Sequence, residues 1–248
     1  MKIIMDKNNY DWATPQNILV ILAHPDDPEF FCGGTIAKWA IEGHQINYCL
    51  LTKGDKGIND QFILNDSLKI KELRVKEENK AAKILGVNDV LFLNNPDGYL
   101  IPDLSLRRQV VMAIRKFKPD IVVSCDPTNY YMNDRTITHP DHRAAGQVVV
   151  DAVFPAAQNE AFFPDLMING KLEPHKVNEV WLSLPTIANI VIDVTDTWTI
   201  KLNALHEHFS QIGDFNIFDK RMRERHTEDS TIENPRFEES FRRIVLQH

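Results

Sequence analysis

Two clusters of histidine and aspartate are the residues of this chain best suited to chemistry. The first is Ala-His-Pro-Asp-Asp at residues 23–27, directly after the apolar run 18–22, and the second is His-Pro-Asp-His at residues 139–142, after the apolar run 121–125. Imidazole nitrogen and carboxylate oxygen bind zinc, and a catalytic zinc site uses three protein ligands so that one position stays open for water or substrate. The two clusters together therefore predict one divalent metal site.

His24, Asp27 and His142 would supply the three ligands. Pro25 has a fixed φ and no amide hydrogen, which disfavours continuing the strand and lets His24 and Asp27 turn toward each other. That arrangement leaves Asp26 free to act as general base for a water molecule at the metal, whose pKa the ion lowers.

The second cluster offers further acid–base groups. Pro140 suits the first position of a helix, and Asp141 in that first turn is favoured by the helix dipole. His139 and His142 are three residues apart and would share one face of the helix. His139 could hydrogen-bond or protonate the developing oxyanion or leaving group, with Asp141 as its orienting partner. These roles describe metal-assisted hydrolysis.

Each cluster also has a purely structural interpretation. Residues 24–27 could form a turn with an Asx cap, and His139 could cap a helix with His142 exposed one turn later. Two such clusters, each at the carboxyl end of a strand-like run, favour the metal site.

The elements that must position these residues follow from hydrophobic periodicity. Strand-like runs alternate with helical patterns, and Gly43 and Gly86 are placed as C-terminal caps of two helices. This alternation predicts an α/β fold with a Rossmann-like, mostly parallel sheet flanked by helices, which binds ligands at the carboxyl ends of its strands. The expected strands are Ile18–Ala23, Ile46–Thr52, Val90–Leu93, Ile121–Cys125, Glu179–Leu184 and Asn189–Val194; the expected helices are Gly34–Glu42, Ser67–Leu85, Leu104–Phe117, one from Pro140, and one from Thr197 to about Gln211.

Composition limits the class of protein. The chain has 248 residues, 43% of them apolar, and a net charge of −7, which fits a single domain over residues 1–248 and argues against general attraction to nucleic acid. No apolar run has the length of a membrane span, so we expect a cytoplasmic location. Cys32, Cys49 and Cys125 lack a Cys-x-x-Cys spacing, and we expect them to pack in the core.

Three further regions carry open alternatives. The loops at residues 53–57 and 94–98 are explained by turn chemistry, but Asp97 and backbone amides could also bind substrate hydroxyls. Arg74 and Glu77 could form an exposed pair or a buried one that reaches the site. Residues 154–176 are long for a loop and are predicted to form a lid or an assembly surface, although their aromatics could equally be core.

These residues resemble the PIG-L or LmbE-like family of metal-dependent deacetylases, which remove acetyl groups from N-acetylglucosaminyl conjugates. The matching motifs are residues 23–27 and 139–142, Arg74-x-x-Glu77 leading into Leu-Gly-Val at 85–87, the Asp97-Gly98 turn, and Glu-Ser-Phe-Arg-Arg at 239–243. The match spans most of the chain, and the two histidine motifs are specific as a pair.

The resemblance implies the same assignment as the chemical argument. His24, Asp27 and His142 look like the Zn²⁺ ligands, Asp26 like the general base, and His139 like the residue that assists the oxyanion or the leaving amine. Arg74 and Asp97 are similar to family positions that hold the sugar or its aglycone. The implied partner is a small N-acetylated molecule, and we expect a homo-oligomer.

The chain departs from the family pattern at two positions. Many members have Glu directly after the two aspartates, whereas here Pro28 precedes Glu29. Some members carry a mobile Tyr two residues before the first histidine of the second motif, where this chain has Ile137. Either His139 and zinc are enough to polarise the acetyl carbonyl, or Tyr130 or Tyr131 takes the place of the family Tyr.

Three other functions compete with the deacetylase for the same residues. A Rossmann-like nucleotide-binding module would have a Gly-x-Gly-x-x-Gly turn after the first strand, and acidic residues there would repel a pyrophosphate. An amidase of the same metal chemistry acting on a non-sugar amide would have identical catalytic residues. A metal-binding protein without activity would not need Asp26 as a base.

Overall fold

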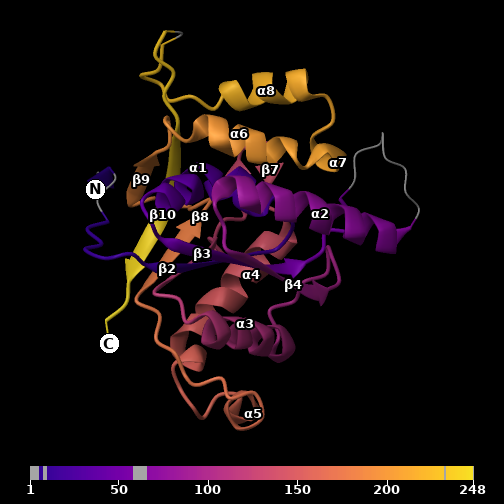
Figure 1. The fold of residues 1–248 in the computed structure, drawn as a ribbon, viewed down its shortest axis with the longest axis vertical. Coiled ribbons are helices and arrows are strands. Elements are labelled where there is room, and N and C mark those ends of the chain that lie inside the picture. The colour runs from indigo at the N-terminus through magenta and orange to yellow at the C-terminus, as the bar shows by residue number, and fades with distance from the viewer. Residues whose placement is uncertain (1–5, 8–9, 58–65, 232, 248) are drawn as a thin grey trace.

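A sheet of eight strands runs through the middle of the described chain, which comprises residues 6–7, 10–57, 66–231 and 233–247 of this computed structural model (Figure 1). Its strand order is β1-β9-β10-β8-β5-β2-β3-β4. β10 (Glu238–Val245) runs antiparallel to both of its neighbours, and the other pairs are parallel. The mostly parallel α/β fold is therefore as the sequence predicts.

The central strands are buried along almost their whole length. β2 (Asn17–Leu22) lies between β3 (Gln45–Thr52) and β5 (Ile121–Cys125), and β4 (Asp89–Asn95) forms the edge beyond β3. Continuous apolar runs are typical of parallel strands covered by helices on both faces. Each expected strand here is present with bounds shifted by at most two residues.

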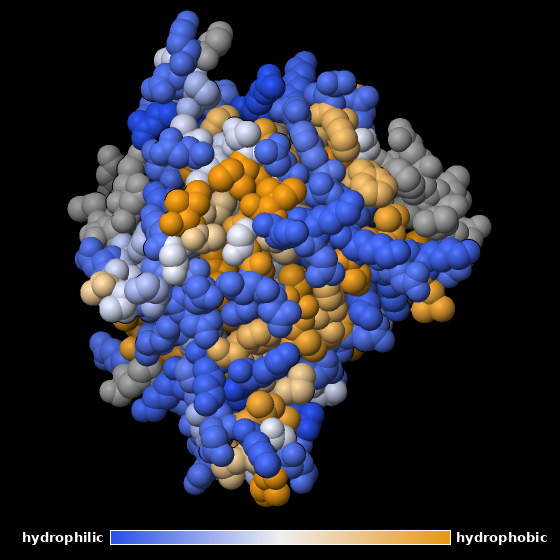
Figure 2. Space-filling model, in the orientation of Figure 1, coloured by the Kyte–Doolittle hydropathy of each residue, from blue (hydrophilic) through white to orange (hydrophobic). Residues whose placement is uncertain are grey.

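Helices cover both faces of the sheet (Figure 1). α1 (Asp27–Ile41), α2 (Ser67–Leu85) and α6 (Trp198–His206) pack on one face, and α3 (Leu104–Phe117) and α4 (Pro140–Asp151) pack on the other, which gives two apolar cores. The side chains of Asp66 and Asp103 cap the first turns of α2 and α3, and Gly86 ends α2 with φ 83°. On the face in Figure 2 the outer side of α2 is mainly hydrophilic, and hydrophobic residues show between the helices.

α1 begins at Asp27, seven residues before the helix expected at Gly34. Pro28 occupies its first turn, and the backbone breaks from helical geometry at Cys32 (φ −148°, ψ 17°). Beyond the break, the amide groups of Gly34 and Thr35 donate to the Glu239 carboxylate of β10 at 3.0 and 2.8 Å. A buried carboxylate thus caps the second half of α1, as helix N-termini favour.

Glu239 is held by a second buried charge. Lys201 on α6 donates to it at 2.6 Å and to the carbonyl oxygen of Phe30 at 3.0 Å. The motif at residues 239–243 is therefore part of β10, which lies between β8 (Glu179–Ser183) and β9 (Ile190–Asp193). The sequence analysis did not assign this strand.

The C-terminal helical region differs from expectation. The single helix expected from Thr197 to Gln211 is divided into α6 and α7 (Phe209–Ile212), with His208 at the junction. α8 (Phe215–Arg223) follows, a helix that the sequence analysis did not assign, and its Phe218 and Met222 are buried against the core. An amphipathic pattern in nine residues is too short to stand out from a charged surface.

Shorter elements complete the chain. They are β1 (Asp6–Lys7), the hairpin β6 (Tyr131–Asn133) and β7 (Thr136–Ile137), a π-helical turn η1 (Ala152–Ala157) and α5 (Pro164–Ile168). Arg115 of α3 is buried and donates to backbone carbonyls of residues 156, 157, 159 and 162. Within the ranges described, every helix is too short or too polar to cross a lipid bilayer.

Candidate functional site

A cavity of about 430 Å³ opens at the carboxyl ends of β2, β3 and β4. It is lined by all the predicted site residues except Asp141, and they come from loops, from helix starts and, for Arg74, from the middle of α2, far apart in the sequence. The chemically active lining residues are His24, Asp26, Asp27, Arg74, Asp97, His139 and His142. The edge of the sheet where ligands were expected is the edge where these side chains converge.

Asp27 lies between two of the predicted ligands. Its Oδ1 is 3.0 Å from His142 Nε2, and its Oδ2 is 3.3 Å from His24 Nδ1. Ligand atoms around a tetrahedral zinc ion, with bonds of about 2.0–2.2 Å, lie about 3.3 Å from one another. Asp27 therefore meets each histidine at about this separation, through Oδ1 to His142 and Oδ2 to His24, and the donor types are those that such an ion needs.

Two other groupings of potential ligands share His24. Nitrogen atoms of His24, His139 and His142 lie within 4.8 Å of one another, and so do ligand atoms of His24, Asp97 and Asp141. Asp97 already accepts from the Lys56 amide at 2.7 Å, and Asp141 already accepts from backbone amides. Asp27 likewise accepts from an amide, that of His24 at 2.9 Å, and it differs from the other two carboxylates in that it contacts His142 as well as His24.

Asp97 and Asp141 act on the far side of the His24 ring. His24 Nε2 is 3.1 Å from Asp97 Oδ1 and 3.2 Å from Asp141 Oδ2, while His24 Nδ1 faces Asp27. Asp141 is itself fixed by the amides of Gly98 and Leu100 at 2.8 and 3.1 Å. The Asp141 carboxylate thus orients His24, while the Asp141 amide contacts the ring of His139, the partner that the sequence analysis expected for Asp141.

The charges around His24 create a demand for a cation. Although burial opposes it, the carboxylate of Asp27, with Asp141 and Asp97, raises the pKa of His24 to about 12. Burial likewise opposes the effect of His142 and His24, which hold the pKa of Asp27 well below its usual range. A group of carboxylates that attracts a proton so strongly also suits a divalent cation, whose charge would replace the proton.

Asp26 is held in an uncommon conformation. Its φ is 91°, in the left-handed region that non-glycine residues seldom adopt. Its Oδ2 is 3.1 Å from the guanidinium of Arg74, and its amide donates to Glu78 at 2.9 Å. Burial raises the pKa of the Asp26 carboxyl against the opposing charge of Arg74, and a raised pKa is what a general base near neutral pH requires.

The open pairing of Arg74 with Glu77 is not found among the described residues: Glu77 accepts from the amide and hydroxyl of Ser210, and the buried Arg74 pairs instead with Asp26. Its guanidinium also donates to the carbonyl oxygens of Pro25, Gly54 and Gly57. Arg74 and Asp97, the predicted substrate contacts, both line the cavity. Both also form hydrogen bonds or ion pairs within the protein. Their contacts with Asp26 and His24 make them part of the scaffold of the site.

His139 lies beside the same cluster. Its Nδ1 accepts from the amide of Asp141 at 3.2 Å, so in a neutral ring Nε2 carries the hydrogen. Burial lowers the pKa of His139, which favours that neutral form. Its ring centroid is 4.9 Å from that of His24.

Tyr130 and Tyr131, the possible substitutes for the family Tyr, lie outside the cavity lining. Ile137 is 74% exposed on β7 and pairs in register with Tyr131, which is equally exposed. The Tyr130 ring stacks against the guanidinium of Arg143, with 4.5 Å between its centroid and Cζ. All three cysteines are buried and free, as expected.

A third cluster was missed by the sequence analysis. Glu29, Glu78 and His208 are fully buried behind Asp26, and their ligand-type atoms lie within 4.8 Å of one another. Burial raises the pKa of both carboxyls well above the usual range. The sequence did contain a sign of this burial in α2. Ile70 and the Ala81-Ala82 pair mark the buried face of the helix, and the charged residues Arg74, Glu77 and Glu78 fall on the same face.

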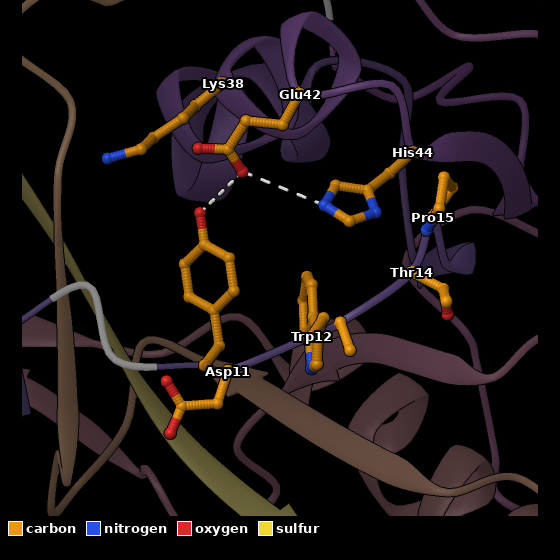
Figure 3. A pocket seen from close by; sticks show the side chains of 9 residues that line it. Asp11, Trp12, Thr14, Pro15, Lys38, Glu42 and His44 are labelled. Atoms are coloured by element: carbon orange, nitrogen blue, oxygen red, sulfur yellow. Dashed lines mark hydrogen bonds and ion pairs between the residues drawn. The ribbon is translucent and has the colours of Figure 1, made fainter.

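A second cavity, of about 490 Å³, lies at the amino ends of β2 and β3 (Figure 3). It is walled by residues 10–15 and by the end of α1. Tyr10 donates to Glu42 at 2.7 Å, and His44 Nε2 is 3.8 Å from the same carboxylate. Trp12 packs on His44 and on Trp39.

Comparison with known proteins gives a consistent family. Residues 19–153 match the family model described as PIG-L, GlcNAc-PI de-N-acetylase. The chain is 34% identical over 205 residues to a diacetylchitobiose deacetylase of Thermococcus kodakarensis, covering 83% of this chain and 73% of that protein. It is 28% identical to a probable N-acetyl-α-D-glucosaminyl L-malate deacetylase 2 of Bacillus anthracis, covering 80% and 82%.

A solved structure agrees over nearly the whole chain. The N,N'-diacetylchitobiose deacetylase of Pyrococcus horikoshii, in complex with an inhibitor, superposes with a TM-score of 0.82 at 28% identity, covering 95% of this chain and 88% of that one. The mostly parallel sheet with helices on both faces is thus the fold of a deacetylase.

Proposed function

Because this chain belongs to the PIG-L (GlcNAc-PI de-N-acetylase) family, we propose that it removes the N-acetyl group from a small N-acetylglucosaminyl conjugate by metal-dependent hydrolysis. The protein is a hydrolase of the N-deacetylase type. The observation that carries the proposal is Asp27 in contact with both His24 and His142, with Asp26 beside them in one cavity.

We propose that His24, Asp27 and His142 hold Zn²⁺. The proposal is supported by the contacts of Asp27 with His142 and His24, at 3.0 and 3.3 Å, which are close to the separation of ligand atoms around a tetrahedral ion. Asp97 and Asp141 orient the His24 ring from behind. When bound, zinc lowers the pKa of a water molecule and polarises an amide carbonyl. His139 is not among the proposed ligands, so a His139→Ala variant is expected to keep its zinc.

The chain's own residues supply the proton transfers. Asp26, held by Arg74, takes a proton from the attacking water, and its raised pKa suits that step. His139 then presents its Nε2 hydrogen to the developing oxyanion or to the leaving amine. Acetate and the free amine are the products of this hydrolysis.

Arg74 and Asp97 are the proposed contacts to the sugar. A carboxylate has about four acceptor positions, and Asp97 uses one on His24 and one on the Lys56 amide, which leaves acceptors for sugar hydroxyls. Arg74 lines the same cavity and places its positive charge beside Asp26.

Two alternatives remain distinguishable by experiment. An amidase acting on a non-sugar amide would use the same residues. A nucleotide-binding module has less support, because Asp26 and Asp27 follow β2 where a phosphate-binding turn would need glycines and amide groups.

Assembly is a separate proposal. We propose a homo-oligomer of single-domain chains in which residues 154–176 form an assembly surface; a lid is less supported, because that segment contributes no residue to the cavity lining. Phe154 and Ile168 are 64% and 71% exposed there, and α5 extends away from the sheet (Figure 1). Light scattering of wild type and of Phe154→Asp would test it: an unchanged mass in the variant argues against this surface.

The test of function is release of free amine from a panel of N-acetylglucosaminyl conjugates by zinc-loaded protein, with Asp26→Asn as the contamination control. Turnover by the wild type alone supports deacetylation and ranks the aglycones. A zinc-loaded wild type that releases no amine from any sugar, but does so from a non-sugar N-acetyl amide, supports the amidase instead.

A further inference from the structure

Glu29 of α1, Glu78 of α2 and His208 before α7 have no part in the mechanism above, yet all three side chains are fully buried. His208 Nε2 is 3.3 Å from Glu29 Oε2 and 3.8 Å from Glu78 Oε2. Burying such groups is unfavourable unless they are paired, and apolar residues of similar size often pack better. Their presence behind the active site therefore calls for a purpose other than stability.

Glu78 reaches the active site through the backbone. Its Oε2 accepts the amide hydrogen of Asp26 at 2.9 Å. Asp26 has a φ of 91°, and a conformation of this kind persists only where the surroundings fix it. The Asp26 carboxylate is held separately by Arg74 at 3.1 Å. The residue is thus held at both ends, at its amide and at its side chain.

We propose that Glu78, supported by His208, is a positioning residue that fixes the Asp26 amide so that the Asp26 carboxylate points into the cavity. This inference rests on the proposed role of Asp26 as general base. If the side chain of a general base is its only fixed point, the peptide group can rotate and change the direction of the carboxylate. A second hydrogen bond at the amide prevents that rotation and keeps the carboxylate directed at the water. Glu78 touches neither substrate nor metal in this proposal.

The supporting residue comes from a part of the chain outside residues 19–153. His208 lies at the start of α7, and Ser210 two residues later donates from its amide and its hydroxyl to Glu77 at 3.0 and 2.7 Å. Two residues at the start of this region therefore lie against neighbouring residues of α2: Ser210 is hydrogen-bonded to Glu77, and the His208 imidazole faces Glu78 at ion-pair distance, 3.8 Å, without a hydrogen bond. Glu78 also accepts the Asp26 amide, whereas Glu77 is the residue that Ser210 contacts. Ser210 is therefore a matched control, because its substitution alters the same region without touching the partner of Asp26.

Two conservative variants of Glu78 distinguish the position of its acceptor oxygen from its negative charge. Glu78→Gln keeps an oxygen acceptor at the same reach but loses the charge, whereas Glu78→Asp keeps the acid but is one methylene shorter. We expect kcat to stay within about threefold of wild type in Glu78→Gln and to fall about 100-fold in Glu78→Asp, the scale of a misplacement of about 1 Å. KM and zinc content are expected to stay at wild-type values in both. Ser210→Ala should loosen α7 and leave kcat unchanged.

Amide hydrogen exchange at Asp26, followed by NMR, provides a readout independent of turnover. Exchange should be faster in Glu78→Asp than in wild type and unchanged in Glu78→Gln. Wild-type kcat and exchange in both variants, or greater activity in Glu78→Asp than in Glu78→Gln, would overturn the proposal. If the wild type releases no amine from any conjugate, the proposed function fails, while the exchange experiment still decides whether Glu78 holds the Asp26 amide.

Discussion

The two cavities at opposite ends of the parallel strands have similar volumes, about 430 and 490 Å³, and each contains histidine and carboxylate side chains. At the carboxyl end, His24 is within 3.3 Å of three carboxylates, and one of these also touches His142. At the amino end, in Figure 3, one carboxylate, that of Glu42, contacts both Tyr10 and His44. Convergence of several ligand atoms, rather than size of the hollow, distinguishes the candidate active site.

The direction of the helices explains the difference. α1 and α4 begin beside the carboxyl-end cavity, and each carries an aspartate in its first turn, Asp27 and Asp141. The positive end of a helix dipole stabilises carboxylates there. The amino-end cavity instead meets the end of α1 at Glu42, where the helix offers carbonyl oxygens. Clustered carboxylates therefore belong at one end of this fold and not at the other.

Removing a ligand tests the comparison most severely. His142→Ala is expected to lose bound zinc and to lower kcat/KM by more than about 1,000-fold, because the metal contributes several kcal/mol to the transition state. Metal analysis of purified protein measures the first effect and amine release the second. Full zinc content in the variant would undo the assignment of His142.

Removing the base should separate chemistry from metal binding. Asp26→Asn is expected to keep its zinc and lose about 100- to 1,000-fold in kcat, the usual contribution of general-base catalysis. Metal analysis and steady-state kinetics on the same preparation check both parts. Wild-type kcat in this variant would remove Asp26 from the mechanism.

Removing a carboxylate behind His24 should have an effect on zinc binding that is smaller than the loss of a ligand. Asp141→Ala takes away the carboxylate 3.2 Å from His24 Nε2, and loss of such a partner typically weakens metal binding about 10- to 100-fold. Competition with a chelator of known affinity gives the zinc dissociation constant. Asp151→Ala, at the other end of α4 and bonded to Arg107, is the control and should bind zinc as the wild type does.

At the amino end, substitutions should alter stability and leave catalysis unchanged. Glu179 bonds Arg243 at 2.6 Å and the indoles of Trp12 and Trp181, and Glu179→Gln is expected to cost about 2 kcal/mol. Although burial opposes it, these bonds hold the pKa of Glu179 below its usual value. The stabilisation is therefore full above the pKa of the unfolded chain and is lost as pH falls through the lower folded-state pKa.

Thermal unfolding of both proteins, from neutral pH down to about pH 3, checks this sign. The difference in stability between wild type and Glu179→Gln should shrink toward the acid end of the series. A difference that grows on acidification would mean that Glu179 is not the group that titrates.

Tyr10→Phe should have the smallest effect. Its hydroxyl donates to Glu42 in a partly exposed contact, so about 0.5–1 kcal/mol of stability is at stake. Amine release is expected to match the wild type. A large loss of kcat/KM would contradict the contrast between the two cavities, because it would give the amino end a catalytic role.

The sequence predicted the elements whose signals are local. The helix at residues 67–85 is present with its expected bounds because Asp66 and Gly86 mark its ends. β10 was missed because its pattern places Glu239 inward, a choice that depends on Lys201 and on the amides of α1. Buried charge becomes acceptable through partners distant in sequence, which one strand's own pattern does not contain.

The candidate site also has a part that the sequence predicts and a part that it does not. The residues expected to converge do converge, because they follow strands whose carboxyl ends share one edge of the sheet. Their pairing could not be read from spacing: Asp141 faces His24 because the backbone at Gly98 and Leu100 fixes it there. The same holds for Glu78, whose place next to Asp26 depends on how α2 packs on α1.

The position of β10 between β8 and β9 has a consequence for the order in which the protein is built. A nascent chain that has emerged as far as β9 already contains His24, Asp27 and His142, yet Glu239 has not been synthesised. Until β10 arrives, the amides of Gly34 and Thr35 lack their carboxylate acceptor and the two neighbouring strands have nothing between them. The helix that carries Asp27 is therefore completed only after most of the polypeptide has left the ribosome.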